Sequence, residues 1–426
     1  MKEEFLHYVW KHQLFPKAPL ITVNNQKLRL LKPGTYNAFS GPDFFNATIV
    51  VDDLIWVGNI EVHVRTSDWY LHNHEKDENY DSVILHVVWK DDVELFDKNN
   101  KPISTLELSS IVSRGLVENY YNLYSRKLRW IPCENQIKEV DSFTIENWKT
   151  RLYFERLEQK SILIKKLLGA SQNDYEAVLF QLLAKNFGLN VNGEAFLKLA
   201  TSFDFSILRK VQNDVIKIEA LLFGQAGFLV EVLDNSYYLV LKEEYKYLQH
   251  KFQLKPIHKS AFEFFRLRPS NFPTIKIALL AALYHKHQNM FSKFLNCVGL
   301  EDYYQLFKID LNEFWDTHFT FHKEANKRKK RFTKSFIDLL LINTIIPLQF
   351  MYLKSRVVFD EEQFLLVLKQ IQSEKNGIVS KFSALGIQTE NALDTQALIQ
   401  LKNNYCAKKR CLQCAIGNKL LRKNLV

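Results

Sequence analysis

Carboxylate and imidazole side chains are concentrated between residues 43 and 86. Asp43 and Glu61 form an acidic pair, and His63 follows two positions after Glu61. Two carboxylates beside an imidazole suit a hard divalent cation such as Mg²⁺ or Mn²⁺, which keeps coordination positions for water and a phosphate oxygen. We therefore expect Asp43 and Glu61 to bind such a cation, with the His63 imidazole beside them.

Three more histidines lie close by in the sequence. His72 and His74 are two positions apart, so they do not share a helical face, but both can reach one site from a broken turn. They are candidates for catalysis, for a second metal site or for phosphate contacts, and the alternative is a structural, hydrogen-bonded role. His86 lies in an apolar run, which predicts a buried histidine with satisfied hydrogen bonds.

Strands must position these groups. In a strand alternate side chains share a face, so Glu61 and His63 point together while Ile60, Val62 and Val64 point to the core side. A tight turn at 52–54 is expected to pair two strands and bring Asp43 beside Glu61. Runs rich in β-branched and aromatic residues predict strands at 27–31, 45–51, 55–64 and 82–89, after an amphipathic helix at 1–14.

The pattern changes after residue 110. Apolar residues three and four apart predict helices at 145–169, 174–189, 211–229 and 274–287. The predicted fold class is α+β: an N-terminal mixed β-sheet module, a larger all-α domain, and a basic tail that carries cysteines. The expected boundaries are 1–110, 111–400 and 401–426.

The tail contains a second group of metal-ligand residues. Cys406, Cys411 and Cys414 have the spacing C-x4-C-x2-C, and Cys133 is the candidate for a fourth ligand. Thiolates this close together are a common way to hold Zn²⁺ or an iron–sulfur cluster. The alternative is a group of reduced, partly buried thiols.

Charge is shared unevenly along the chain. Residues 1–110 hold 11 Lys/Arg against 16 Asp/Glu, whereas the whole chain has a net charge of +10. The strongest basic run, 327–331, predicts contacts with DNA or RNA, and Phe321 and Phe332 beside it either stack on bases or pack into the core. Arg266 and Arg268 either cap a helix or hold phosphate. The alternative for the basic run is a solvated loop.

Composition excludes several classes of protein. A chain that is 47% hydrophobic and 24% charged is ordinary for a globular protein. The longest apolar run, 336–353, is interrupted by Asp338, Asn343 and Pro347, which favours a buried helix over a membrane span. With five cysteines and no secretory signal, we expect a cytoplasmic protein without a membrane partner.

Two resemblances add to this interpretation. The order helix, strand, Pro-Asp strand, turn, Glu-x-His strand, helix, strand resembles the PD-(D/E)xK nuclease core, which has a restriction-endonuclease-like fold. The resemblance implies that Asp43 and Glu61 are the metal-binding acids, with Glu3 or Glu4 as an extra acid. It also implies that His63 replaces the usual lysine, and so activates or orients water for phosphodiester hydrolysis. One distant cysteine with three near the end is similar to the plan of some RecB-like nucleases.

The whole chain is also similar to an uncharacterised bacterial family, a domain of unknown function of about this length. The segments that carry this similarity are SGPDFFNA, GNIEVHVRTSDWYLHNHEKDENYDSVILHVVW, EALLFGQAGFL, RPSNFPTIKIA and CLQCAIGNKLL. The sequence as a whole predicts a metal-dependent phosphodiester hydrolase that acts on nucleic acid. The alternatives are a catalytically inert nucleic-acid-binding or scaffold protein with the same fold, and a hydrolase of small phosphate esters.

Overall fold

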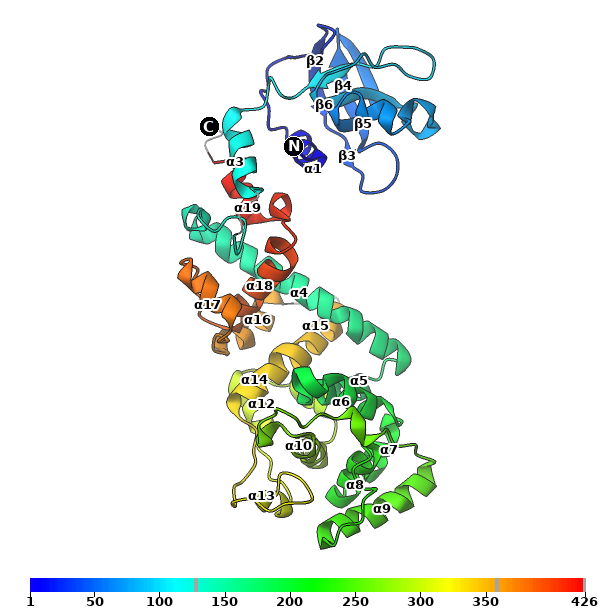
Figure 1. Cartoon of the computed structure of the whole chain (residues 1–426), viewed down its shortest axis with the longest axis vertical. Coiled ribbons are helices and arrows are strands. Elements are labelled where there is room, and N and C mark those ends of the chain that lie inside the picture. The colour runs from blue at the N-terminus through cyan, green and yellow to red at the C-terminus, as the bar shows by residue number, and fades with distance from the viewer. Residues whose placement is uncertain (126–128, 357–359, 424–426) are drawn as a thin grey trace. The chain divides into compact units, whose positions relative to one another are not determined.

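The computed structural model describes residues 1–125, 129–356 and 360–423, and contacts divide the chain into two compact units (Figure 1). Unit 1 consists of residues 1–148 and 401–426, and unit 2 of residues 149–400. The sequence predicts boundaries after residues 110 and 400. In the structure, contacts place residues 111–148 and the cysteine-bearing tail in the same unit as the sheet.

Unit 1 is built on a mixed, seven-stranded sheet. Its order is β1-β2-β4-β5-β6-β7, with β3 paired to β4; the pairs up to β4/β5 are antiparallel, and β5/β6 and β6/β7 are parallel. The α+β class and the mixed sheet are thus confirmed. The strands are β1 (Leu20–Ile21), β2 (Lys27–Lys32), β3 (Thr35–Tyr36), β4 (Phe44–Val51), β5 (Leu54–Arg65), β6 (Val83–Lys90) and β7 (Thr105–Glu107).

The connection between β5 and β6 determines where the histidines lie. Parallel neighbours need a crossover rather than a hairpin. Here the crossover consists of α2 (Asp68–Leu71) and two 3₁₀ turns, η1 (His74–Lys76) and η2 (Glu78–Tyr80). Trp69 is buried and packs against Val83 of β6, which fixes the crossover on the sheet.

Helix α1 (Glu3–Lys11) covers part of the same sheet and packs against β5. Its apolar side chains Phe5, Leu6, Val9 and Trp10 are fully buried. Because a helix repeats every 3.6 residues, the remaining stripe carries Glu3 and Glu4 in its first turn, one turn before His7. Burial of the apolar face therefore fixes which polar groups of α1 approach the sheet.

The tail completes unit 1 next to α3 (Arg114–Leu123), and in Figure 1 the red α19 lies beside the cyan α3. Asn119 donates its side-chain amide to the carbonyl oxygens of Leu421 and Lys423, each at 3.1 Å. Arg422 donates to the Tyr8 hydroxyl at 3.0 Å. The further elements of unit 1 are η3 (Ile137–Glu139), η7 (Leu401–Cys406), η8 (Cys411–Gln413) and α19 (Ala415–Leu421).

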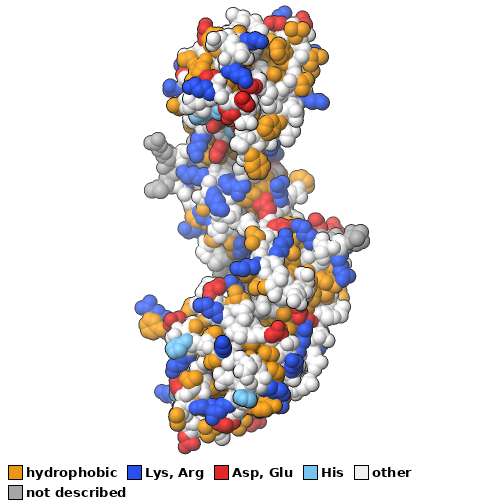
Figure 2. Space-filling model, turned by 90° about the vertical axis from the view of Figure 1, so that its right-hand side faces the viewer, with side chains coloured by type: hydrophobic (Ala, Val, Ile, Leu, Met, Phe, Trp, Pro, Cys, Tyr) orange, Lys and Arg blue, Asp and Glu red, His pale blue; other side chains and the backbone are white. Residues whose placement is uncertain are grey.

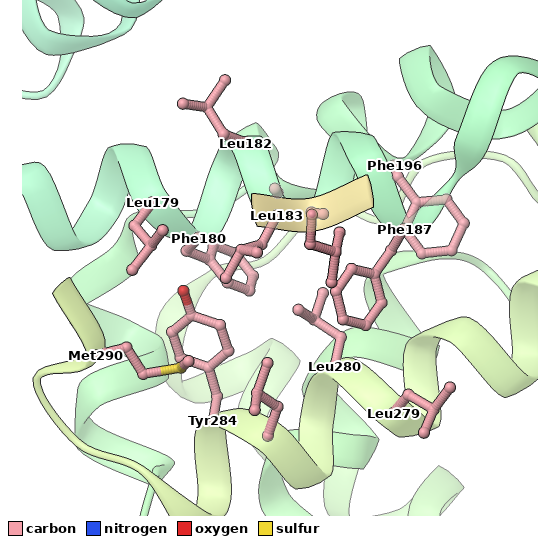
Figure 3. Packing of buried hydrophobic residues seen from close by; sticks show 14 of the residues in the cluster. Leu179, Phe180, Leu182, Leu183, Phe187, Phe196, Leu279, Leu280, Tyr284 and Met290 are labelled. Carbon is pink, nitrogen blue, oxygen red and sulfur yellow. The ribbon is translucent and has the colours of Figure 1, made fainter. Parts of the chain in front are cut away.

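Unit 2 is helical. Its core contains α10, whose residues from Pro273 to Tyr284 are all buried, and Figure 3 shows Leu280 and Tyr284 of this helix facing Phe180, Leu183 and Phe187 of α5. After α4 (Ser142–Ala170), the helices are α5 (Tyr175–Phe187), α6 (Leu189–Thr201), α7 (Phe205–Val211), α8 (Val215–Gln225), α9 (Ser236–Phe252), α10 (Pro273–Lys286), α11 (Met290–Leu295), α12 (Leu300–Leu306), α13 (Phe314–Thr317), α14 (Lys334–Leu340), α15 (Ile346–Lys354), α16 (Glu361–Gln370), α17 (Gly377–Ala384) and α18 (Ala392–Gln400), with short turns η4 (Lys259–Ala261) and η5 (Pro269–Asn271).

The apolar run near residue 340 forms a continuous helical stretch, Lys334–Lys354, with a π-helical turn, η6 (Leu341–Ile345), at its centre. Within the described residues, this stretch alone has the length and composition of a membrane span. Most of its apolar window is buried inside the protein, as in the core helix of a globular unit.

Candidate metal centre

The β4–β5 hairpin brings Asp43 and Glu61 together. Phe44 pairs with Ile60 across the two antiparallel strands, so Asp43 lies opposite Glu61. The Asp43 amide donates to Glu61 Oε2 at 3.1 Å, and the Val62 amide donates to Asp43 Oδ2 at 3.0 Å. The backbone of each strand thus holds the carboxylate of the other, in the register that the sequence predicts.

Two imidazoles lie near the second Glu61 oxygen, and a third lies beside one of them. Glu61 Oε1 lies 3.5 Å from His63 Nε2 and 3.4 Å from His74 Nε2. His72 Nδ1 lies 3.1 Å from His63 Nε2. One nitrogen from each of the three histidines falls within 4.8 Å of the others, which is the arrangement that can hold one metal ion.

A break in the helix explains how His72 and His74 reach one site. Helix α2 ends at Leu71 with His72 as its C-cap, and Asn73 then adopts a left-handed conformation with φ of 59°. Asparagine tolerates this region better than most residues. Because of this turn, the side chains of His72 and His74 reach the same site although they are two positions apart. The Tyr80 ring stacks on His74 with the ring centroids 3.7 Å apart.

Helix α1 adds two groups from the other side of the site. His7 Nε2 lies 3.0 Å from Asp43 Oδ2, and Glu3 Oε1 lies 4.0 Å from His63 Nε2. Glu3 is one of the two candidates for the extra acid that the nuclease resemblance implies. His7 was missed by sequence reasoning, although its spacing of four from Glu3 places both on one helical face.

His86 lies behind the site on β6 and is completely buried. Its Nε2 is 2.8 Å from His63 Nδ1, so the two rings share one proton between them. Among the described atoms its Nδ1 has no hydrogen-bond partner, so the expectation of a satisfied buried histidine holds for one ring nitrogen only. The shared proton fixes the orientation of His63 and leaves its Nε2 directed at Glu61 and His72.

Burial favours the uncharged forms of the ionisable side chains in this cluster. Burial, followed by the charge of Asp43, raises the pKa of Glu61 to about 9. Burial, followed by the neighbouring histidines, lowers the pKa of His63 to about 2, and burial also lowers the pKa of His74. At neutral pH Glu61 therefore retains a proton beside neutral imidazoles, and a divalent cation can replace that proton.

The face opposite the site is less uniform than the alternation predicts. Ile60 and Val62 are completely buried, but Val64 is only partly buried. Glu61 and His63 are themselves 5% and 2% exposed, so the polar face is covered rather than open. The cover comes from α1 and from the crossover that carries His72 and His74.

The four cysteines Cys133, Cys406, Cys411 and Cys414 line one small cavity within unit 1. Its volume is about 10 Å³, close to the smallest space that holds one water molecule. Burial, followed by the charge of Cys414, raises the pKa of Cys133 to about 12, and burial with nearby thiols also raises the pKa values of Cys406 and Cys411. Two segments far apart in the sequence thus bring four cysteine residues to the lining of one small cavity.

The aromatic residues beside the basic run pack into the core of unit 2. Phe321 is buried against Phe223 and Trp315, and Phe332 contacts Phe187 with ring centroids 5.6 Å apart. Of the two alternatives for these rings, core packing is therefore the one observed, and neither ring is available to stack on bases.

The sheet and its cluster of carboxylate and imidazole groups define an α+β protein with a site that can hold a metal ion. The chain belongs to the family described as "Protein of unknown function (DUF2851)", whose sequence model matches residues 3–377. No curated protein and no solved structure matches the chain.

Proposed function

We propose that unit 1 is a metal-dependent phosphodiester hydrolase that acts on DNA or RNA. The observation that supports this most is the convergence of Asp43, Glu61 and three histidines on one site. The order α1, β4 with Pro42-Asp43, β5 with Glu61-x-His63, α2 and parallel β6 also resembles the PD-(D/E)xK core. Both observations favour metal-assisted attack on a phosphate.

The ligands favour a transition metal over Mg²⁺. Imidazole nitrogens bind Mn²⁺ and heavier divalent ions, whereas Mg²⁺ prefers oxygen ligands and water. With His63, His72 and His74 beside Glu61, we assign Mn²⁺ as the better of the two ions that the carboxylates alone suggest. A divalent ion bound there acts as a Lewis acid toward phosphate and lowers the pKa of bound water.

The roles of the side chains follow from their contacts. His63 is a metal ligand rather than the group that activates water, because its Nδ1 is engaged by His86 and its ring is buried. Asp43 and His7 form the pair that can move a proton. Burial opposes the charge of His7, but its contact with Asp43 and the charge of that carboxylate raise its pKa above the ordinary value, so the protonated ring is favoured beside Asp43.

A nuclease assay tests the proposal. Single- and double-stranded DNA and RNA are incubated with the full chain and Mn²⁺ or Mg²⁺, and cleavage is compared with Asp43→Asn and Glu61→Gln. We expect each substitution to reduce the rate by more than about a hundredfold, since even residues behind a metal ligand contribute ten- to a hundredfold. Glu118→Gln, an exposed carboxylate on α3, is the matched control.

Cleavage that survives Asp43→Asn and Glu61→Gln would remove this site from the reaction. The alternative is a catalytically inert nucleic-acid-binding or scaffold protein. His63 favours that alternative, because burial keeps it neutral where the nuclease core usually carries a lysine. The wild-type chain would then bind nucleic acid and cleave none of the substrates with either ion.

We also propose that Cys133, Cys406, Cys411 and Cys414 bind a metal with a structural role, as Zn²⁺ or as an iron–sulfur cluster. The supporting observation is that all four line one cavity. Elemental analysis of the purified chain should find zinc or iron, and Cys133→Ser should lose it. Cys297→Ser is the control, because Cys297 is a half-buried cysteine of unit 2. Neither element in the wild-type chain would refute the proposal.

A further inference from the structure

Unit 2 contains a large cavity with a strongly basic lining, here called the basic cavity. Its volume is about 810 Å³, within the range of roughly 300–1,000 Å³ that is usual for ligand pockets. It joins two segments that the sequence singled out separately, the connection around Arg268 and the basic run. Among the described residues that line it there is no Asp or Glu. The cationic residues of the lining are Arg268, Lys276, Arg328, Lys329, Lys330 and Arg331.

Lys276 is the residue that distinguishes this cavity from a solvated basic surface. It lies on α10 and is 5% exposed, and its Nζ lies 3.5 Å from the centre of the Phe336 ring. Within the described part of the chain, neither a carboxylate nor a hydrogen-bond acceptor contacts this ammonium group. Burial lowers its pKa to about 8. A buried cation without a counterion is costly unless an anion approaches it.

Two other lysines of unit 2, the buried Lys149 and the partly buried Lys160, have oxygen partners. Lys149 donates to Asp394 Oδ1 at 2.9 Å, and Lys160 donates to the Ile342 carbonyl and to Asn343 Oδ1, both at 2.9 Å. Each has an oxygen partner supplied by the protein. Lys276 has an aromatic ring and the cavity instead, so its oxygen partner is expected to come from a ligand.

The basic run is held in place around the cavity. Lys330 is buried, donates to the Asp316 carbonyl at 2.8 Å, and lies over the Phe319 ring at 4.4 Å. The Arg328 amide donates to the same carbonyl at 2.7 Å. These contacts fix the backbone from 328 to 330, which reduces the entropy that an anion must overcome on binding.

The basic cavity differs from the rest of the surface in its charge. Figure 2 shows Lys and Arg side chains over both units, interspersed with Asp and Glu, so net charge alone does not locate a binding site. In the basic cavity, cations and the hydroxyls of Ser270, Thr333 and Ser335 occur together with apolar walls. This combination suits a ligand that carries both phosphate and an apolar ring.

We propose that the basic cavity binds the phosphates of a nucleic-acid strand, with Lys276 as the internal partner of one phosphate. The identity of the ligand as nucleic acid rests on the proposed function. In this proposal, unit 2 binds the strand. Arg268 and Arg328 contact neighbouring phosphates, and Phe319 and Phe336 provide apolar surface for a sugar or base.

Binding is tested without cleavage. A fluorescein-labelled single-stranded oligonucleotide is titrated with the full chain in EDTA, and affinity is measured by fluorescence anisotropy. Lys276→Met should weaken binding by about ten- to a hundredfold, the range expected for a hydrogen bond to a charged group. Lys327→Gln, which removes an exposed charge from the same run outside the cavity lining, should change affinity by less than about threefold.

Salt dependence and folding controls accompany the titration. Removing one phosphate contact should lower the slope of log affinity against log salt by about 0.7 in Lys276→Met. The melting temperature of this variant should be equal to or above that of the wild-type chain. If Lys276→Met does not fold, Arg268→Gln replaces it, because Arg268 is exposed and its loss leaves the core intact.

Equal affinity of wild-type, Lys276→Met and Arg268→Gln chains would overturn the inference, as would equal weakening by Lys327→Gln. Competition identifies the ligand: an unlabelled oligonucleotide should displace the probe at far lower concentration than a mononucleotide or inorganic phosphate. If a mononucleotide competes as well as the oligonucleotide, the strand assignment is wrong. Binding without cleavage would refute only the proposed function, and cleavage without dependence on Lys276 would refute only this inference.

Discussion

The metal centre of unit 1 and the basic cavity of unit 2 present the same physical situation with opposite sign. Glu61 is a buried carboxyl that holds a proton, and Lys276 is a buried ammonium group that tends to lose one. Each is removed from water without a full counterion from the protein. Burial of this kind is costly for stability, and it agrees with the two proposals, which give unit 1 a cation and unit 2 an anion as ligand.

The largest expected effect is on Mn²⁺ binding, and it distinguishes the site in unit 1 from the basic cavity in unit 2. Glu61→Gln should weaken Mn²⁺ binding by about a hundredfold or more at pH 8, because it removes the carboxylate shared by His63 and His74. Isothermal titration calorimetry measures this, with Glu118→Gln as the control. Oligonucleotide binding in EDTA should be unchanged in Glu61→Gln, and Mn²⁺ binding unchanged in Lys276→Met. If either substitution weakened the binding of both ligands, Mn²⁺ and the oligonucleotide would not bind at two independent sites.

The next effect concerns the pH dependence of stability. Folded Glu61 retains its proton up to about pH 9, whereas the unfolded carboxyl loses it near 4.5, so rising pH favours unfolding across that window. His63 acts in the opposite direction: it is neutral when folded down to about pH 2 but protonated when unfolded below 6.5, so its contribution rises with pH up to about 6.5. Each group changes the free energy of unfolding by at most about 1.4 kcal/mol per pH unit.

Chemical denaturation of the metal-free chain between pH 5 and 9, at intervals of about one pH unit, measures this dependence. We expect the wild-type chain to lose stability relative to Glu61→Gln as the pH rises from about 6.5 toward 9. Saturating Mn²⁺ should remove that loss, because the metal replaces the proton. A constant difference between the two chains over this range would mean that Glu61 is ionised without metal.

A smaller effect is expected in unit 2. Lys276→Met should raise the free energy of unfolding by about 1–2 kcal/mol at pH 7, because it replaces a buried ammonium group by an apolar side chain of similar length. The gain should narrow from about pH 8 to 10.5, where the folded lysine is neutral and the unfolded one is still charged. Denaturation at pH 7 and pH 10 tests this, with Lys327→Gln as the control. A loss of stability would assign Lys276 a structural role.

The smallest expected effect concerns Tyr80, which helps to orient His74 in the candidate metal centre. Tyr80→Leu removes the ring that stacks on His74 but keeps apolar bulk, so His74 loses one constraint on its orientation. Mn²⁺ affinity should fall about three- to tenfold, in line with the usual contribution of an aromatic pair. Tyr121→Leu, an exposed tyrosine on α3, is the control for the calorimetry. Unchanged affinity would show that α2 and η1 alone position His74.

Local patterns predict the core of the first site well. Alternation along residues 55–64 places Glu61 and His63 on one face, and the short turn after Val51 fixes the register with Asp43. His7 was missed because the sequence of α1 does not say which strand its polar stripe faces. That information comes only from packing of α1 on β5.

Long-range packing also explains what was missed in unit 2. Lys276 interrupts an apolar helix, a position that local patterning assigns to solvent, but α10 is buried on all sides and carries the lysine inward. The run 327–331 predicted phosphate contacts without a location. The Asp316 carbonyl positions the backbone of this run, and Arg268 lines the same cavity. No local pattern reveals these neighbours.

The return of the tail to unit 1 has a consequence for biosynthesis. Because unit 1 is completed by residues 401–426, the ribosome must translate the 252 residues of unit 2 before α19 can dock on α3. At about 5–20 residues per second this delay is about 13–50 s. During that time unit 2 can finish folding, while the surface of α3 and the Cys133 thiol wait for their partners. The nascent chain therefore carries an incomplete first unit until residues 401–426 have been made.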